Sequence, residues 1–218
     1  MGNKSLYCIG MMGGMFDPVH IGHLETARLL HELIGLDEVH MVPCSNPVHR
    51  EAGLATVEQR CRMLEIASAE YPWMSVDRRE CDRVGPSWTF ITLASARAEY
   101  PDASISLMMG LDAFISLPTW YRWQELFELG HIIVSARPDV VMDEAAMSTE
   151  LVQVVKQRVV KTPALLHQNR AGNLYFAEIA TPPVSSTDVR IKAGSGAPLT
   201  QVLPQALLHY IHAQQLYR

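Results

Sequence analysis

Hydrophobic positions along the chain alternate between two patterns. Short unbroken apolar runs predict buried β-strands, whereas apolar residues spaced three or four apart predict helices. The expected strands are residues 7–12, 38–43, 73–77, 104–109, 131–136 and 173–179. The expected helices are residues 25–34, 57–70, 87–100, 144–161, 186–193 and 203–214. Thr56 and Gln59 have the spacing of a capping box, which predicts the start of the second of these helices.

Strands that alternate with helices predict an α/β fold, with a doubly wound, Rossmann-like parallel sheet and helices on both faces. Ligands of such sheets bind beyond the carboxyl ends of the strands. No repeat or linker divides the sequence, so we expect a single domain over residues 1–218. Residues 139–170 fit the alternation least well and are expected to form a peripheral insertion or lid. Residues 185–218 are expected to form a small C-terminal helical part.

Composition narrows the class of protein. The chain has 218 residues, of which 48% are hydrophobic and 19% charged, so it can bury a substantial core. Its net charge of −5 argues against broad nucleic-acid binding, which needs a basic face. No apolar run approaches the roughly 18 residues of a membrane span. The four cysteines include no C-x-x-C pair, and we expect reduced thiols in a cytoplasmic protein.

The stretch from Gly13 to Leu24, GGMFDPVHIGHL, is the most informative part of the sequence. A strand, a glycine turn and a helix N-terminus together present backbone N–H groups that bind phosphate. His20 and His23 lie three apart where this helix begins, so both imidazoles are expected to face the same anion. Two other interpretations are histidines on a helix surface and half of a metal site, although no further ligand pattern accompanies them. The chain contains neither a P-loop nor a G-x-G-x-x-G motif.

This stretch resembles the GGTFDPxHxGHL signature of the H-x-G-H nucleotidyltransferases. Five more segments resemble motifs of one branch of that superfamily, the nicotinate mononucleotide adenylyltransferases, and they occur in the same order. They are PCSNPVHR (43–50), GPSWT (85–89), GLD (110–112) with LPTWY (117–121), ARP (136–138) and VSSTDVR (184–190). The resemblance covers residue 8 to the C-terminal Leu216-Tyr217-Arg218.

The resemblance implies an adenylyltransferase that uses ATP and nicotinate mononucleotide. It implies catalytic roles for His20, His23 and Arg190. The implied ATP-binding residues are Gly13, Gly14, Met15, Phe16, His20, His23, Gly110, Asp112, Arg137, Ser186, Thr187 and Arg190. The implied mononucleotide-binding residues are Asp17, His49, Arg50, Thr89, Trp120 and Tyr121, with Trp120 stacked on the nicotinate ring and backbone N–H groups near Thr89 and Tyr121 at its carboxylate. Mg²⁺ is expected to be held mainly by phosphates and water rather than by a protein metal site.

Several of these residues also have simple structural explanations. Ser185 to Thr187 can cap a helix, Asp112 can do the same, and the charges of His49 and Arg50 can belong to a solvated loop. Trp123 is expected in the core. Two departures from the family pattern stand out. Met15 replaces the usual threonine, and Val48 replaces the second proline of the loop before His49.

The implied reaction is in-line attack of the mononucleotide phosphate on the α-phosphorus of ATP, with pyrophosphate leaving. Nicotinamide mononucleotide or phosphopantetheine is the alternative acceptor, and cytidylyltransferases share the same turn. Class I aminoacyl-tRNA synthetases share the HIGH string, but this chain is too short and has no KMSKS loop. The alternative of another class is a catalytically silent nucleotide-binding module. The sequence leaves a homo-oligomer open.

Overall fold

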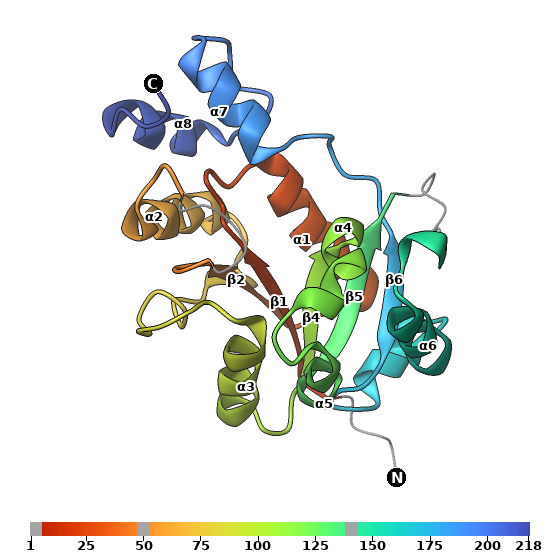
Figure 1. Cartoon of the computed structure of the whole chain (residues 1–218). Helices are drawn as coiled ribbons and strands as arrows, with labels where there is room; N and C mark the ends of the chain where they lie inside the picture. The colour runs from red at the N-terminus through yellow and green to blue at the C-terminus, as the bar shows by residue number, and fades with distance from the viewer. Residues whose placement is uncertain (1–5, 48–52, 138–143) are drawn as a thin grey trace.

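Six parallel strands form one sheet at the centre of the structure, a computed structural model that describes residues 6–47, 53–137 and 144–218 (Figure 1). The strands are β1 Cys8–Gly14, β2 Glu38–Pro43, β3 Met74–Val76, β4 Ser104–Gly110, β5 His131–Ala136 and β6 Leu174–Glu178. Their order across the sheet is β3-β2-β1-β4-β5-β6. The predicted doubly wound parallel sheet is therefore confirmed.

The predicted helices are present with shifted ends, and two short helices that the sequence pattern did not predict, α4 and α5, are added between β4 and β5. They are α1 Ile21–Ile34, α2 Val57–Ser68, α3 Thr89–Glu99, α4 Leu111–Ile115, α5 Leu126–Leu129, α6 Thr149–Arg158, α7 Ser186–Gly194 and α8 Gln205–Ala213. Short 3₁₀ turns cover Leu117–Thr119, Trp123–Glu125, Glu144–Ala146 and Pro163–His167. The predicted capping box is present, since the Thr56 hydroxyl accepts from the Gln59 N–H and the Gln59 side chain accepts from the Thr56 N–H.

Alternate residues of the strands enter two separate cores, except in the short edge strand β3, whose apolar residues enter one core. In β1, Cys8 and Met12 pack with α1, α2 and α8 on one face, whereas Ile9 and Met11 pack with α3, α5 and α6 on the other. This two-residue alternation is what a sheet covered on both faces requires. No helix within the three described ranges is long and apolar enough to cross a bilayer.

Strand order reverses between β1 and β4. From β1 the chain builds outward through β2 and β3, and then it returns to the other side of β1 to add β4, β5 and β6. The connections after β1 and β4 therefore leave in opposite directions and open a crevice at the carboxyl ends of these strands. Gly13, Gly14 and Gly110 lie at that crevice.

The described part of residues 139–170 connects β5 with β6, which pair in parallel. The predicted helix 144–161 is divided into a 3₁₀ turn and α6. Leu151 of α6 and Leu166 after it are fully buried, one in each core. This segment is thus a packed crossover of the doubly wound fold. A lid movement stays a prediction.

Candidate active site

The turn between β1 and α1 reverses the chain sharply. Phe16 takes a left-handed backbone conformation (φ 50°) that non-glycine residues seldom adopt. Its ring is buried and meets His23 edge-on, with ring centroids 5.0 Å apart. His20 then caps α1, which begins four residues earlier than the sequence pattern predicts. The His20 N–H donates to Nδ1 of His23.

The two histidine rings stack with centroids 3.7 Å apart. Gly22 makes this arrangement feasible, because a Cβ there would come within 3.0 Å of the His20 ring. Burial lowers the pKa of His20 to about 4, although Asp188 opposes the shift. Burial, reinforced by His20, lowers the pKa of His23 to about 3. Both imidazoles are therefore neutral near pH 7 and can donate hydrogen bonds without carrying charge.

Helix α7 lies beside this turn, at the top of the view in Figure 1. Ser185 caps it by accepting from the Asp188 N–H. The Arg190 guanidinium donates to the Asp17 carbonyl at 2.8 Å and to the Thr187 hydroxyl at 3.2 Å. The Ser186 hydroxyl donates to the Pro18 carbonyl at 2.9 Å. The structure thus brings the predicted phosphate-binding residues of α7 against the predicted histidine turn, 160 or more residues away in sequence.

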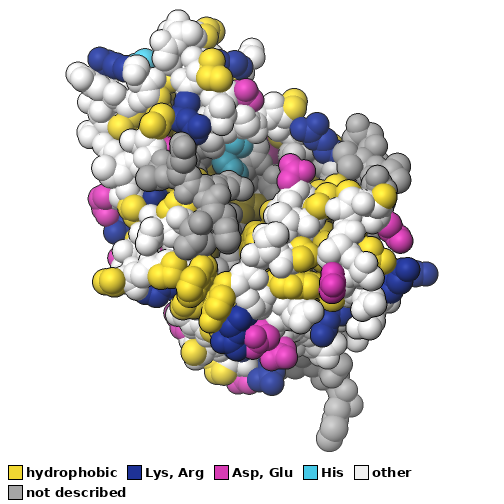
Figure 2. Space-filling model, in the orientation of Figure 1, with side chains coloured by type: hydrophobic (Ala, Val, Ile, Leu, Met, Phe, Trp, Pro, Cys, Tyr) yellow, Lys and Arg dark blue, Asp and Glu magenta, His cyan; other side chains and the backbone are white. Residues whose placement is uncertain are grey.

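A cavity of about 460 Å³ opens next to the turn at the crevice between β1 and β4. This volume is within the range of small-molecule sites. Figure 2 shows the hollow in the middle of this face, with histidine side chains visible at it. Gly13, Gly14, Met15 and Gly110 line one end, and a Cβ on Gly13 or Gly110 would meet no atom within 4 Å. Space beside these two glycines is therefore open for a ligand.

The other end of the cavity is formed by the start of α3 and by residues 119–121. Thr89 is the first residue of α3, so its N–H has no acceptor within the helix. Trp120 lines the cavity. The Tyr121 ring stacks on Trp88 with centroids 4.3 Å apart. Three of the predicted mononucleotide residues therefore meet at one end of the cavity.

The predicted core position of Trp123 agrees with its packing against the core of the α3 face. Asp112 is exposed in the first turn of α4, and Arg137 is exposed at the end of β5. Neither lines the cavity. The same holds for the predicted residues at and beside the histidine turn, which are His20, His23, Ser186, Thr187 and Arg190. His49 and Arg50 lie outside the described residues, as does Val48.

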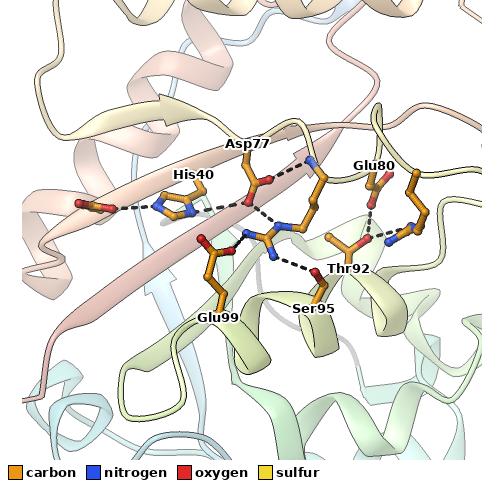
Figure 3. Close-up of polar contacts among 9 residues, drawn as sticks. His40, Asp77, Glu80, Thr92, Ser95 and Glu99 are labelled. Atoms are coloured by element: carbon orange, nitrogen blue, oxygen red, sulfur yellow. Dashed lines mark hydrogen bonds and ion pairs between the residues drawn. The ribbon is translucent and has the colours of Figure 1, made fainter.

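The sequence motifs gave no role to Glu80 and Thr92, which also line the cavity. Glu80 is buried, and one of its carboxylate oxygens accepts from the Thr92 hydroxyl at 2.6 Å (Figure 3). Ser87 is a third residue without an assigned role. Its hydroxyl oxygen accepts from the N–H groups of Ser45 and Asn46, and this ties the start of α3 to the loop after β2.

The segment between β3 and α3 carries this cavity wall and is held by a polar network (Figure 3). Arg79 donates to Asp77, Ser95 and Glu99, so it joins the end of β3 to the outer side of α3. His40 on β2 contacts Asp77 with one ring nitrogen and Glu38 with the other. The network fixes α3 to the edge of the sheet.

No three His, Cys, Asp or Glu side chains converge on a metal-binding position in residues 6–47, 53–137 and 144–218. Near the turn the donors are imidazoles, a guanidinium and backbone N–H groups, and these suit the oxygens of a polyphosphate.

Comparisons with known proteins agree with this geometry. The model of the cytidylyltransferase-like family matches residues 11–192. A protein of Methylococcus capsulatus named probable nicotinate-nucleotide adenylyltransferase is 41% identical over 210 residues, which cover 96% of this chain and 99% of that one. A protein of the same name from Aeromonas hydrophila is 39% identical, with 96% and 97% covered. The Plasmodium falciparum nicotinic acid mononucleotide adenylyltransferase complexed with NaAD superposes with a TM-score of 0.72 at 15% identity, with 96% and 97% covered.

The histidine turn at the switch point of a parallel sheet and the family match place this chain among the cytidylyltransferase-like nucleotidyltransferases. Within that class the chain belongs to the nicotinate-nucleotide adenylyltransferase family, because its relatives of that name match nearly its whole length. The fold of the Plasmodium structure agrees with this assignment.

Proposed function

We propose that this protein transfers the adenylyl group of ATP to nicotinate mononucleotide, which yields deamido-NAD and pyrophosphate for NAD biosynthesis in the cytoplasm. One observation carries the proposal. A cavity of suitable size runs from the glycine turn beside the stacked histidines to an uncapped N-terminus of α3. The first end offers donors for a polyphosphate, and the second offers backbone donors and an aromatic wall for a pyridine carboxylate.

At the phosphate end, His20 and His23 donate hydrogen bonds to the ATP phosphates. Arg190 supplies the fixed positive charge, and the amides of Gly13 to Phe16 add further donors. Gly110, Asp112, Arg137, Ser186 and Thr187 complete the ATP site in this proposal. Mg²⁺ enters as the ATP complex and is held by phosphate oxygens and water. It neutralises phosphate charge when bound.

At the other end, the N–H groups of Thr89 and Tyr121 receive the nicotinate carboxylate, and Trp120 stacks on the ring. Flat stacking suits an electron-poor aromatic ring. His49 and Arg50 contribute charge to the mononucleotide phosphate. Asp17 was predicted beside them, but its carboxylate accepts hydrogen bonds from the protein itself.

The reaction needs no covalent enzyme intermediate, because the mononucleotide phosphate is already an anionic nucleophile. One of its oxygens forms the new bond to the α-phosphorus of ATP while the bond to the pyrophosphate oxygen breaks. The residues of this chain align the two phosphates and donate to the charge that grows on the leaving pyrophosphate. Positioned donors of this kind account for most of the catalysis in phosphoryl transfer.

Pyrophosphate release in the presence of ATP and Mg²⁺ tests the proposal. Nicotinate mononucleotide, nicotinamide mononucleotide and phosphopantetheine are offered separately, and the nucleotide product is identified by mass. We expect turnover with nicotinate mononucleotide and a product of the mass of deamido-NAD. Turnover with phosphopantetheine alone would identify another adenylyltransferase. ATP binding without turnover on any acceptor would identify a silent nucleotide-binding module.

A further inference from the structure

Asp17 lies in the middle of the histidine turn, and its carboxylate is buried against donors of the protein itself. One carboxylate oxygen accepts from the Leu54 N–H at 2.7 Å. The other accepts from the Ala55 N–H at 3.1 Å and from the Tyr217 hydroxyl at 2.6 Å. Asp17 is only 4% exposed, so these bonds satisfy a charge that burial would otherwise disfavour.

Tyr217 reaches Asp17 across 200 residues, from the penultimate position of the chain. The chain turns back after α8 through two residues with left-handed backbone, Gln215 (φ 54°) and Tyr217 (φ 62°). Non-glycine residues keep such conformations only where surrounding contacts hold them. The Tyr217 ring packs in the core beside Met63 of α2.

The Tyr217 hydroxyl stays a donor near neutral pH. Burial raises its pKa, and the hydrogen bond and charge of Asp17 raise it further, whereas Arg190 and Arg60 oppose the shift. Because the hydroxyl does not ionise near neutral pH, its bond to the carboxylate is kept there.

The same short stretch is held from other sides as well. Arg190 donates to the Asp17 carbonyl, and Ser186 donates to the carbonyl of Pro18. Buried Arg60 of α2 donates to the Met15 carbonyl at 2.7 Å. The first N–H of α1, on Ile21, donates to the Val202 carbonyl at 3.1 Å. The turn therefore takes its position from α2, α7 and the segments flanking α8. Tyr217 contributes a side-chain hydrogen bond to the Asp17 carboxylate.

We infer that Tyr217 is a positioning residue for adenylyl transfer. Its bond to Asp17 fixes the turn that carries His20 and His23, so the last residues of the chain set the geometry of the phosphate donors. The inference rests on the proposed function. It also gives Asp17 a role within the turn instead of a direct contact with the mononucleotide.

The test is Tyr217→Phe, which removes the hydroxyl and keeps the ring packed against the core. Tyr7→Phe is the matched control, because Tyr7 also donates to a carboxylate, that of Glu38, at 2.7 Å, but it is exposed and lies at the amino end of β1, opposite the end that carries the cavity. Displacement of catalytic donors by less than 1 Å can lower a rate by about tenfold or more. We expect kcat of Tyr217→Phe to fall about tenfold, with KM for nicotinate mononucleotide within twofold of the wild type and Tyr7→Phe unchanged.

A double-mutant cycle with Asp17→Asn separates positioning from general stabilisation. Asp17→Asn also disturbs the bonds from the Leu54 and Ala55 N–H groups, so its own loss is expected to be the larger one. If the two residues act through their shared contact, the double variant loses less than the two single losses combined. Additive losses would overturn the inference, and so would a Tyr217→Phe enzyme that melts at a lower temperature but keeps its kcat.

Calorimetric titration with ATP tests this inference separately from the proposed function. A wild-type protein that binds ATP but turns over no acceptor would contradict the proposed function alone. In that case, weaker ATP binding by Tyr217→Phe than by Tyr7→Phe would still support the positioning role, and equal binding by the two variants would overturn it.

Discussion

The imidazole rings of His20 and His23 stack face to face, with centroids 3.7 Å apart and planes inclined by 25°. Nδ1 of His23 accepts from the His20 N–H. A neutral imidazole that accepts on Nδ1 carries its proton on Nε2. The contact therefore selects the tautomer of His23 that leaves Nε2–H free to donate toward a phosphate.

This geometry predicts that His23→Ala lowers kcat by about a hundredfold, which is the usual cost of one lost donor to a developing negative charge. The fold should survive. His31→Ala is the control, because His31 lies two turns further along the same helix, where its ring stacks on Trp73. Steady-state kinetics and circular dichroism decide between the outcomes. A folded His23→Ala enzyme with near-normal kcat would contradict the proposed contact of His23 with phosphate.

Trp120 gives a second prediction, on substrate affinity. It lines the cavity end that is proposed for the pyridine ring, whereas the glycine turn lies at the opposite end. Trp120→Ala should therefore raise KM for the mononucleotide about tenfold, in line with the loss of one aromatic stacking contact, and leave KM for ATP within twofold. Initial rates with each substrate varied in turn measure the split. Equal increases in both constants would mean that Trp120 is structural.

Thr92 gives a third prediction, on the orientation of α3. Its hydroxyl bonds to Glu80 one turn after Thr89, whose N–H is proposed to meet the nicotinate carboxylate. Thr92→Val keeps the shape of the side chain and removes the bond, so KM for nicotinate mononucleotide should rise several-fold, by up to about tenfold. Thr92→Ser keeps the hydroxyl and should have the KM of the wild type. If Ser and Val behave alike, the hydroxyl has no positioning role.

The pH dependence of stability gives a fourth prediction, through His40. Burial by itself would lower the pKa of His40, but hydrogen bonds to Asp77 and Glu38 and their charges outweigh it, so the pKa is raised. A raised pKa in the folded state means that protonated His40 stabilises the fold. Its contribution is complete below the unfolded value of about 6.5 and is lost as the pH rises through the folded value.

His40→Asn removes this contribution and isolates it from the other histidines. The melting temperature of the variant should lie below that of the wild type by a few degrees at pH 6, since ~1 kcal/mol shifts it by about 2–4 °C in a chain of this size. The gap should narrow at pH 9. A gap that is independent of pH would show that His40 is neutral in the folded protein.

Local sequence signals were enough for most of the fold. Each expected strand appears within two residues of its predicted bounds, because an apolar run between turn residues is a property of the segment itself. The apolar pattern alone placed the start of α1 four residues late. Its N-cap is His20, whose N–H donates to the His23 side chain, rather than serine, threonine or aspartate, so the usual signal for a helix start is absent.

Contacts between distant segments could not be predicted in this way. Three such contacts depend on how α2, α3 and the C-terminal segment pack. They are the Tyr217–Asp17 bond, the Glu80–Thr92 bond and the approach of Cys61 to Cys81, whose sulfur atoms lie 3.3 Å apart. None of these pairs has a spacing or motif that marks it in the sequence. The histidine turn and the residues of α7 were found through motifs instead, and the fold brings them together.

Comparison of kcat/KM for nicotinate mononucleotide and nicotinamide mononucleotide, at saturating ATP and Mg²⁺, tests the central claim most directly. The cavity end at α3 presents N–H donors, which suit a carboxylate better than an uncharged amide. Hydrogen bonds to a charged partner predict a preference for nicotinate mononucleotide of at least tenfold. Equal values, or a preference for nicotinamide mononucleotide, would contradict the assigned substrate and the role of the α3 N-terminus.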